Sequence, residues 1–91
     1  MSTVRIPPVL RDNAGGSRTV EVTGSTVTEA LDDLFVQHPT LRDRVTADGK
    51  LSEFINVYVN DRDVRYRDGL ATPIGSDDVI ILLPAMAGGS H

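Results

Sequence analysis

The apolar run at residues 79–83 constrains the fold more than any other feature of this chain. It reads Val79-Ile80-Ile81-Leu82-Leu83. Successive side chains of a strand point to opposite faces of a sheet, so this run is apolar on both faces. That pattern is typical of a central strand covered on both sides. We therefore predict a central strand at 79–83, beside the first strand of the chain.

Four other segments have strand-like sequences. Residues 3–6 and 18–22 alternate polar and apolar side chains, with turn-forming residues between them, which favours a hairpin. Residues 54–59 form the strongest strand pattern, and residues 62–65 form a short one. The 54–59 strand has two distinct faces: one carries Ile55, Val57 and Val59, and the other carries Phe54, Asn56 and Tyr58.

One main helix is predicted between the second and third strands. Thr26 and Glu29 have the spacing of a capping box, in which the hydroxyl accepts from the Glu29 amide while the carboxylate reaches back. Apolar residues follow at helical spacing, and Pro39 ends the segment. The stripe consists of Val27, Ala30, Leu31, Leu34 and Phe35. Residues 41–45 are expected to add a short helical turn.

The order strand-strand-helix-strand-strand-strand predicts an α+β fold, with a mixed sheet of about five strands and one main helix packed across it. Residues 1–84 are expected to form this domain, and residues 85–91 a flexible Gly-Gly tail.

Composition restricts the function further. The net charge of −4 does not favour nucleic acid or an anionic membrane, because both are negatively charged. The chain has no cysteine, which excludes disulfides, a thiolate nucleophile and cysteine-based zinc sites. No segment is apolar enough to span a membrane, and no signal peptide is visible, so we expect a cytoplasmic protein. The two histidines, His38 and His91, have no metal-ligating or catalytic neighbours in sequence, so no metal site is predicted.

The C-terminal tail is the strongest functional signal. Ala87-Gly88-Gly89 is narrow and conformationally free, as required of a peptide end that threads into another protein's active site. The simpler interpretation is a frayed terminus or part of an expression linker.

Several stretches together resemble the ThiS/MoaD-type ubiquitin-like sulfur-carrier family, and most of all the CysO-like carriers of actinobacteria. The matching residues are 6–11, 54–61, 63–65, 69–74, 77–79 and the tail 84–89. The resemblance covers nearly the whole chain and implies a β-grasp fold. Two departures are visible: Ser90-His91 follow the second glycine, where family members usually end, and Asp77 stands where a glycine is common.

The resemblance implies a carrier that is not itself an enzyme and has no catalytic residue. A partner enzyme, related to the ubiquitin-activating enzymes, adenylates the Gly89 carboxylate with ATP, and sulfur then converts it to a thiocarboxylate. Gly88 and Ala87 thread the tail into that enzyme, and the carrier itself binds no cofactor. A sulfur-accepting synthase then uses the sulfur to make cysteine or a sulfur-containing metabolite.

The sequence also fits classes of protein other than a sulfur carrier. The same features suit the small subunit of molybdopterin synthase, a ubiquitin-like protein modifier, or a binding module with an inert tail. Ser90-His91 are either the remnant of a purification linker or a native extension that a JAMM-type metalloprotease removes, and in both cases they block chemistry at Gly89.

A partner interface is predicted on the face of the sheet away from the helix. Phe54 and Tyr58 alternate against the apolar face of their strand, and with Leu82 of the last strand they are expected to form an apolar patch. Carriers of this family dock through that face. The simpler interpretation is that these aromatic residues only cover the sheet or pack beneath a loop.

Overall fold

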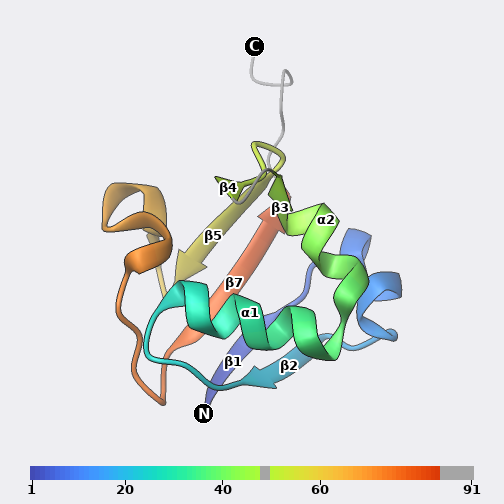
Figure 1. Cartoon of the computed structure of the whole chain (residues 1–91), viewed down its shortest axis with the longest axis horizontal. Helices are drawn as coiled ribbons and strands as arrows, with labels where there is room; N and C mark the ends of the chain where they lie inside the picture. Colours follow the sequence, from blue (N-terminus) through green and yellow to red (C-terminus); the bar gives the residue numbers. More distant parts are fainter. Residues whose placement is uncertain (48–49, 85–91) are drawn as a thin grey trace.

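The computed structural model describes residues 1–47 and 50–84. Its main sheet has five strands in the order β2-β1-β7-β5-β6 (Figure 1). These strands are β1 (Ser2–Arg5), β2 (Thr19–Val22), β5 (Ile55–Val59), β6 (Arg62–Asp63) and β7 (Val79–Pro84). Strand β7 pairs parallel to β1 and antiparallel to β5, so the sheet is mixed. The prediction of a central last strand beside the first is confirmed.

Helix α1 (Val27–Gln37) crosses one face of this sheet. Thr26 caps it, and the Thr26 hydroxyl accepts a hydrogen bond from the Glu29 amide at 3.2 Å. The Glu29 carboxylate reaches back to Ser25, accepting from its amide at 2.8 Å and from its hydroxyl at 3.0 Å. These bonds lower the pKa of Glu29, the Ser25 amide contributing most. The capping prediction holds, with the reciprocal bond made one residue earlier than in the standard box.

Short elements complete the fold. Helix α2 (Arg42–Val45) is the short turn predicted at 41–45, and a small hairpin of β3 (Thr46–Ala47) and β4 (Lys50–Leu51) follows it. Four 3-10 helices connect the other elements: Pro8–Ala14, Pro39–Leu41, Val64–Tyr66 and Gly69–Ala71. The strand predicted at 62–65 therefore ends at Asp63, because Val64 turns into the core, where it is fully buried.

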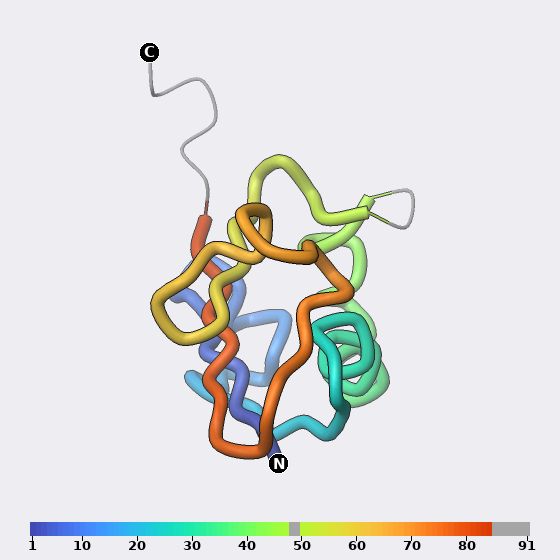
Figure 2. The backbone as a smooth tube through the Cα atoms, turned by 90° about the vertical axis from the view of Figure 1, so that its left-hand side faces the viewer, coloured from blue at the N-terminus to red at the C-terminus, as the bar shows by residue number. Residues whose placement is uncertain are grey.

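One apolar core lies between α1 and the sheet. The five predicted stripe residues of α1 are all buried. They face Ile55, Val57 and Val59 of β5 and Ile80 and Leu82 of β7, which are buried as well. Figure 2 shows α1 on one side of β1 and β7.

The opposite face of β7 is not covered as the sequence predicts. Val79 and Ile81 are half-buried there, and Leu83 is 42% exposed. The prediction of a strand covered on both faces is therefore wrong. The sheet carries its helix on one side, and the apolar residues of the other face remain accessible. None of the helices within residues 1–47 and 50–84 is long and apolar enough to cross a membrane.

Candidate functional site: the surface around the C-terminal exit

The candidate site lies where β7 ends. Pro84 is the last described residue and pairs with Ile55 at the start of β5. The predicted tail residues Ala87, Gly88 and Gly89 lie outside the described residues, as do Ser90-His91. The site is therefore defined by the side chains that surround Pro84.

Exposed apolar side chains gather at this end of the sheet. Val9, Phe54 and Pro84 line one groove. The exposed fractions of Val9 and Phe54 are 67% and 58%. Leu83 lines a second groove beside Pro84. We call Val9, Phe54, Leu83 and Pro84 the exit collar. Grouped exposed apolar side chains often mark a protein interface.

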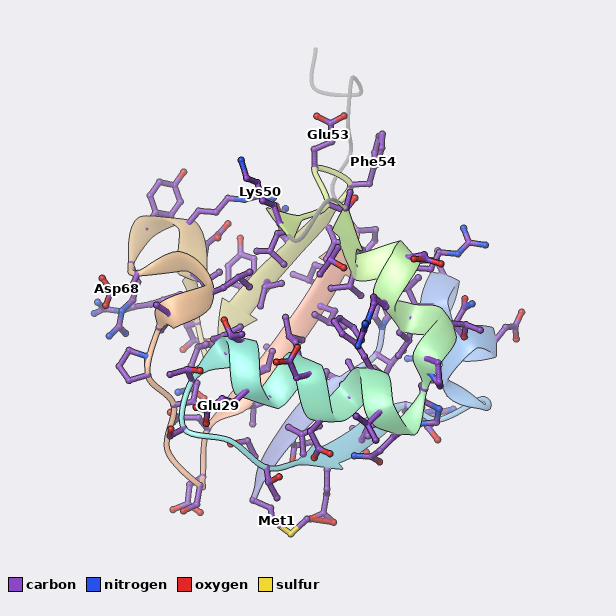
Figure 3. The ribbon with its side chains drawn as sticks, in the orientation of Figure 1. Met1, Glu29, Lys50, Glu53, Phe54 and Asp68 are labelled. Carbon is purple, nitrogen blue, oxygen red and sulfur yellow. The ribbon has the colours of Figure 1, made fainter. Side chains whose placement is uncertain are left out.

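A network of hydrogen bonds holds Phe54 in the collar. Phe54 lies in the turn before β5, and its amide donates to Ser52 Oγ at 3.1 Å. The Arg65 guanidinium donates to Asn56 Oδ1 at 2.6 Å, to the Ile55 carbonyl at 3.1 Å and to the Ser52 carbonyl at 3.4 Å. Figure 3 shows Phe54 projecting from this end of the molecule, near Glu53. Arg65 is thus a positioning residue for the collar, which sequence reasoning missed.

Tyr58 does not join Phe54 in one patch. Tyr58 is half-buried on the open face of the sheet, opposite Ile81, and lines a groove with Tyr66. Phe54 precedes the strand by one residue, and four residues of strand span about 13 Å. Tyr66, which is 89% exposed, was not predicted, because no sequence pattern marks it.

The prediction that Leu82 belongs to the partner interface with Phe54 and Tyr58 is wrong. Its side chain is 1% exposed and belongs to the core beneath α1, so it cannot line the open face. The register explains the error, because Leu82 pairs with the buried Val57, whereas Ile81 pairs with Tyr58. The open face of β7 consists of Val79, Ile81 and Leu83.

A second groove, of about 460 Å³, runs beside the collar and carries three arginines. Arg5, Arg11 and Arg18 line it, together with apolar residues that include Ile81 and Leu83. Arg11 is held in place because its Nε donates to the Ile6 carbonyl at 3.2 Å. We call this feature the arginine groove.

Polar groups at the other end of β7 have structural roles. Asp78 accepts hydrogen bonds from the Gly75 amide at 2.7 Å and from Asn60 Nδ2 at 3.0 Å, and these two bonds lower the pKa of Asp78. Asn60 Oδ1 accepts from the Val79 amide at 3.1 Å, and Asn60 has a φ of 55°. These contacts connect the turn after β5 to the start of β7 and do not touch the collar.

The exposed apolar side chains of the collar are suited to docking another protein. Within the described part of the chain, no group of three or more histidine, aspartate and glutamate side chains is placed to hold a metal ion. His38 ends α1, where its amide donates to the Leu34 carbonyl at 2.8 Å.

The mixed sheet, the crossing helix and the collar at the chain's exit define a ubiquitin-like β-grasp protein, as expected from the sequence. A model of the ThiS family matches residues 4–89, and the chain belongs to this family. Relatives of this chain are small sulfur carrier proteins, which are not themselves enzymes, and this confirms the expectation that the chain is not an enzyme.

Three named relatives support membership of this family. The sulfur carrier protein CysO of Mycobacterium tuberculosis is 42% identical over 90 residues, which cover 96% of this chain and 97% of the relative. CysO of Amycolatopsis orientalis, solved in complex with BexX, is 45% identical with a TM-score of 0.91, and the match covers 98% of this chain and 100% of that one. The small archaeal modifier protein 1 of Methanosarcina acetivorans is 27% identical with a TM-score of 0.85, covering 97% and 95% of the two chains.

Proposed function

We propose that this protein is a sulfur carrier whose C-terminal Gly89 carboxylate is converted to a thiocarboxylate that donates sulfur in the biosynthesis of cysteine or another sulfur-containing metabolite. The observation that supports this most is the exit collar. Exposed apolar side chains surround the end of β7 at Pro84, and a Gly-Gly sequence begins four residues further on, at Gly88. The similarity to CysO over nearly the whole chain supports the same function.

The chemistry requires a partner that activates the carboxylate. The Gly89 carboxylate attacks the α-phosphorus of ATP and releases pyrophosphate, which gives an acyl-adenylate. Sulfide then attacks the carbonyl carbon and expels AMP, leaving the thiocarboxylate. A persulfide that attacks in the same way gives an acyl disulfide, from which a second thiol releases the thiocarboxylate by forming a disulfide with the departing sulfur. The carrier contributes only the reacting carboxylate. ATP and the catalytic groups belong to an adenylating enzyme related to the ubiquitin-activating enzymes.

The collar and the tail have different roles in docking: the collar contacts the partner's surface, and the tail enters its active site. Five extended residues reach at most about 17 Å, so Gly89 enters an active site only when the partner lies close to Pro84. The collar provides the apolar contact area for that approach. Gly88 and Ala87 keep the segment narrow inside the channel. A sulfur-accepting synthase is expected to use the same end of the molecule, and a CysO relative has been solved in complex with BexX.

The test is thiolation by a cognate adenylating enzyme with ATP and a sulfur source, followed by intact mass. A chain that ends at Gly89 should gain the mass of one sulfur-for-oxygen exchange. The chain with Ser90-His91 should not, until a JAMM-type metalloprotease removes them. A chain ending at Gly89 with Gly88→Val should react poorly, because a β-branched side chain widens and stiffens the tail. Equal thiolation with and without Ser90-His91 would refute Gly89 as the reacting residue.

The similarity to small archaeal modifier protein 1 favours a second candidate, a ubiquitin-like modifier. A modifier uses the same activation, but a lysine amine rather than sulfur attacks the activated carbonyl. Cells that express a tagged chain ending at Gly89 would then contain the tag in high-mass conjugates that survive reducing denaturation. A free thiocarboxylate without conjugates supports the carrier.

A further inference from the structure

The arginine groove is a separate feature of the surface beside the collar. Its described lining contains Arg5, Arg11 and Arg18 and no carboxylate, although the chain has 13 acidic residues and nine basic ones. Arg5 and Arg18 are exposed, and Arg11 is half-buried. Between them lie apolar side chains shared with the collar, including Leu83 and Pro84. The groove therefore combines a positive rim with an apolar floor.

The opposite end of β7 differs in charge because it carries carboxylates. Asp77 and Asp78 directly precede this strand. Asp61 follows Asn60, whose amide donates to the Val79 carbonyl at 2.7 Å. Six residues of strand separate this acidic end from Pro84, which is about 20 Å. Arg62 and Arg67 line one groove with Asp61, so this end carries both signs of charge, whereas the described lining of the arginine groove beside the exit of the tail carries positive charge alone.

We propose that the arginine groove binds a carboxylate-rich surface of the adenylating enzyme, beside the opening that receives the tail. This inference rests on the proposed function. Guanidinium groups match carboxylates in geometry and charge. Opposed charges on two partners orient their encounter and raise the association rate. The far end of β7, where carboxylates and arginines are mixed, attracts an acidic surface less strongly than the groove does, which disfavours docking of the carrier in the inverted orientation.

A nucleic acid is the weaker candidate for the same groove. Its phosphates would meet Asp61, Asp77 and Asp78 along the same face, and the net charge of −4 repels a polyanion. No aromatic side chain among the described lining residues offers a stacking surface for a base. A protein carboxylate surface of limited size fits the groove better.

The experiment compares two double variants with the same change in net charge, both in the chain that ends at Gly89. Arg5→Glu with Arg18→Glu reverses the groove. Arg62→Glu with Arg67→Glu reverses two exposed arginines beside Tyr66 and is the control. Binding to the adenylating enzyme is measured by stopped flow and calorimetry over a series of salt concentrations, and thermal melts confirm that both variants are folded.

The groove variant should bind at least roughly tenfold more weakly at low salt, mainly through slower association, and its affinity should depend less on salt. The control should stay within about twofold of the unmodified chain. An unchanged affinity and salt dependence in the groove variant would overturn the proposal. So would an equal loss in the control, because only net charge would then matter.

Two further measurements separate the explanations. Tight binding of the unmodified chain to a short DNA duplex, lost in the groove variant, would replace the proposed occupant by a nucleic acid and overturn the proposal. Thiolation of the unmodified chain tests the proposed function independently. If thiolation proceeds while the groove variant binds normally, only the groove is refuted. If the unmodified chain is never thiolated, the carrier function fails and this inference fails with it.

Discussion

Leu82 and Leu83 are adjacent in β7 but point to opposite faces, so truncating each one separates stability from docking. Leu82 is 1% exposed and belongs to the core beneath α1, whereas Leu83 is 42% exposed in the exit collar. The two alanine variants remove the same atoms from the same strand. Each is therefore a matched control for the other.

The expected loss of stability in each variant follows from how deeply the leucine is buried. A buried leucine replaced by alanine costs about 2–5 kcal/mol, including the cavity that remains. A domain of this length has roughly 5–14 kcal/mol of total stability, so Leu82→Ala removes a large share of it. At about 4–8 °C per kcal/mol, a loss of about 3 kcal/mol lowers the Tm by about 12–24 °C. Leu83→Ala gives up partial burial only, about 1 kcal/mol or less.

The assay is thermal and urea unfolding followed by circular dichroism, with binding to the adenylating enzyme measured on the same samples. Leu83→Ala should keep most of its stability and weaken partner binding by about 1–3 kcal/mol. Leu82→Ala should lose stability, while the molecules that remain folded bind normally. Equal losses of Tm in the two variants would show that the assignment of the two faces of β7 is wrong.

Three further predictions concern other parts of the molecule. The hydrogen bonds of Asp78 lower its pKa in the folded state. They therefore stabilise the fold fully at pH values above the ordinary aspartate pKa of about 3.9, and this contribution is lost as the pH falls through the lower pKa of the folded state. Urea midpoints of Asp78→Asn should therefore lie below those of the unmodified chain at pH 7 and converge with them in stronger acid; a constant difference would contradict this linkage. Gly24→Ala should lower the free energy of unfolding in urea by about 1–3 kcal/mol, because Gly24 has a φ of +147° and a Cβ there would lie 2.7 Å from Glu29 Cβ. An unchanged urea midpoint would mean that the backbone moves to accommodate the added Cβ at no cost. Phe54→Ala should weaken binding to the adenylating enzyme by roughly 1–3 kcal/mol with little loss of Tm, and an unchanged affinity would remove Phe54 from the interface.

Periodic patterns predicted the secondary structure where they were clear. The stripe of α1 repeats at helical spacing, and all five of its residues are buried. The alternation in β5 separated the buried Ile55, Val57 and Val59 from Asn56 and Tyr58. Strand β7 has no alternation, so its sequence carries no information on which face is buried. Only the register, with Leu82 opposite Val57, decides that.

Irregular segments could not be predicted in the same way. The 3-10 helix Pro8–Ala14 begins at the second of two prolines and contains turn-forming residues. It is held by burial of Leu10 and Ala14 rather than by a local pattern. Arg65 acts on residues 9 to 13 positions earlier in the chain, through hydrogen bonds that no spacing rule indicates. The collar was therefore only partly predictable: Phe54 was identified, but the residues around it were not.

The edges of the sheet favour the proposed docking at the exit over docking by strand addition. An exposed edge strand invites another chain to add a strand. Here Gln37 Nε2 donates to the Glu21 carbonyl of β2 at 2.9 Å, and the Asp33 carboxylate accepts from the Thr23 amide at 2.9 Å, so side chains of α1 occupy hydrogen-bonding groups of that edge. At the opposite edge, β6 is only two residues long. A partner consequently gains little by strand addition and must recognise side chains. The apolar collar and the arginines beside it are the side chains around Pro84, the last described residue before the tail that we propose to react.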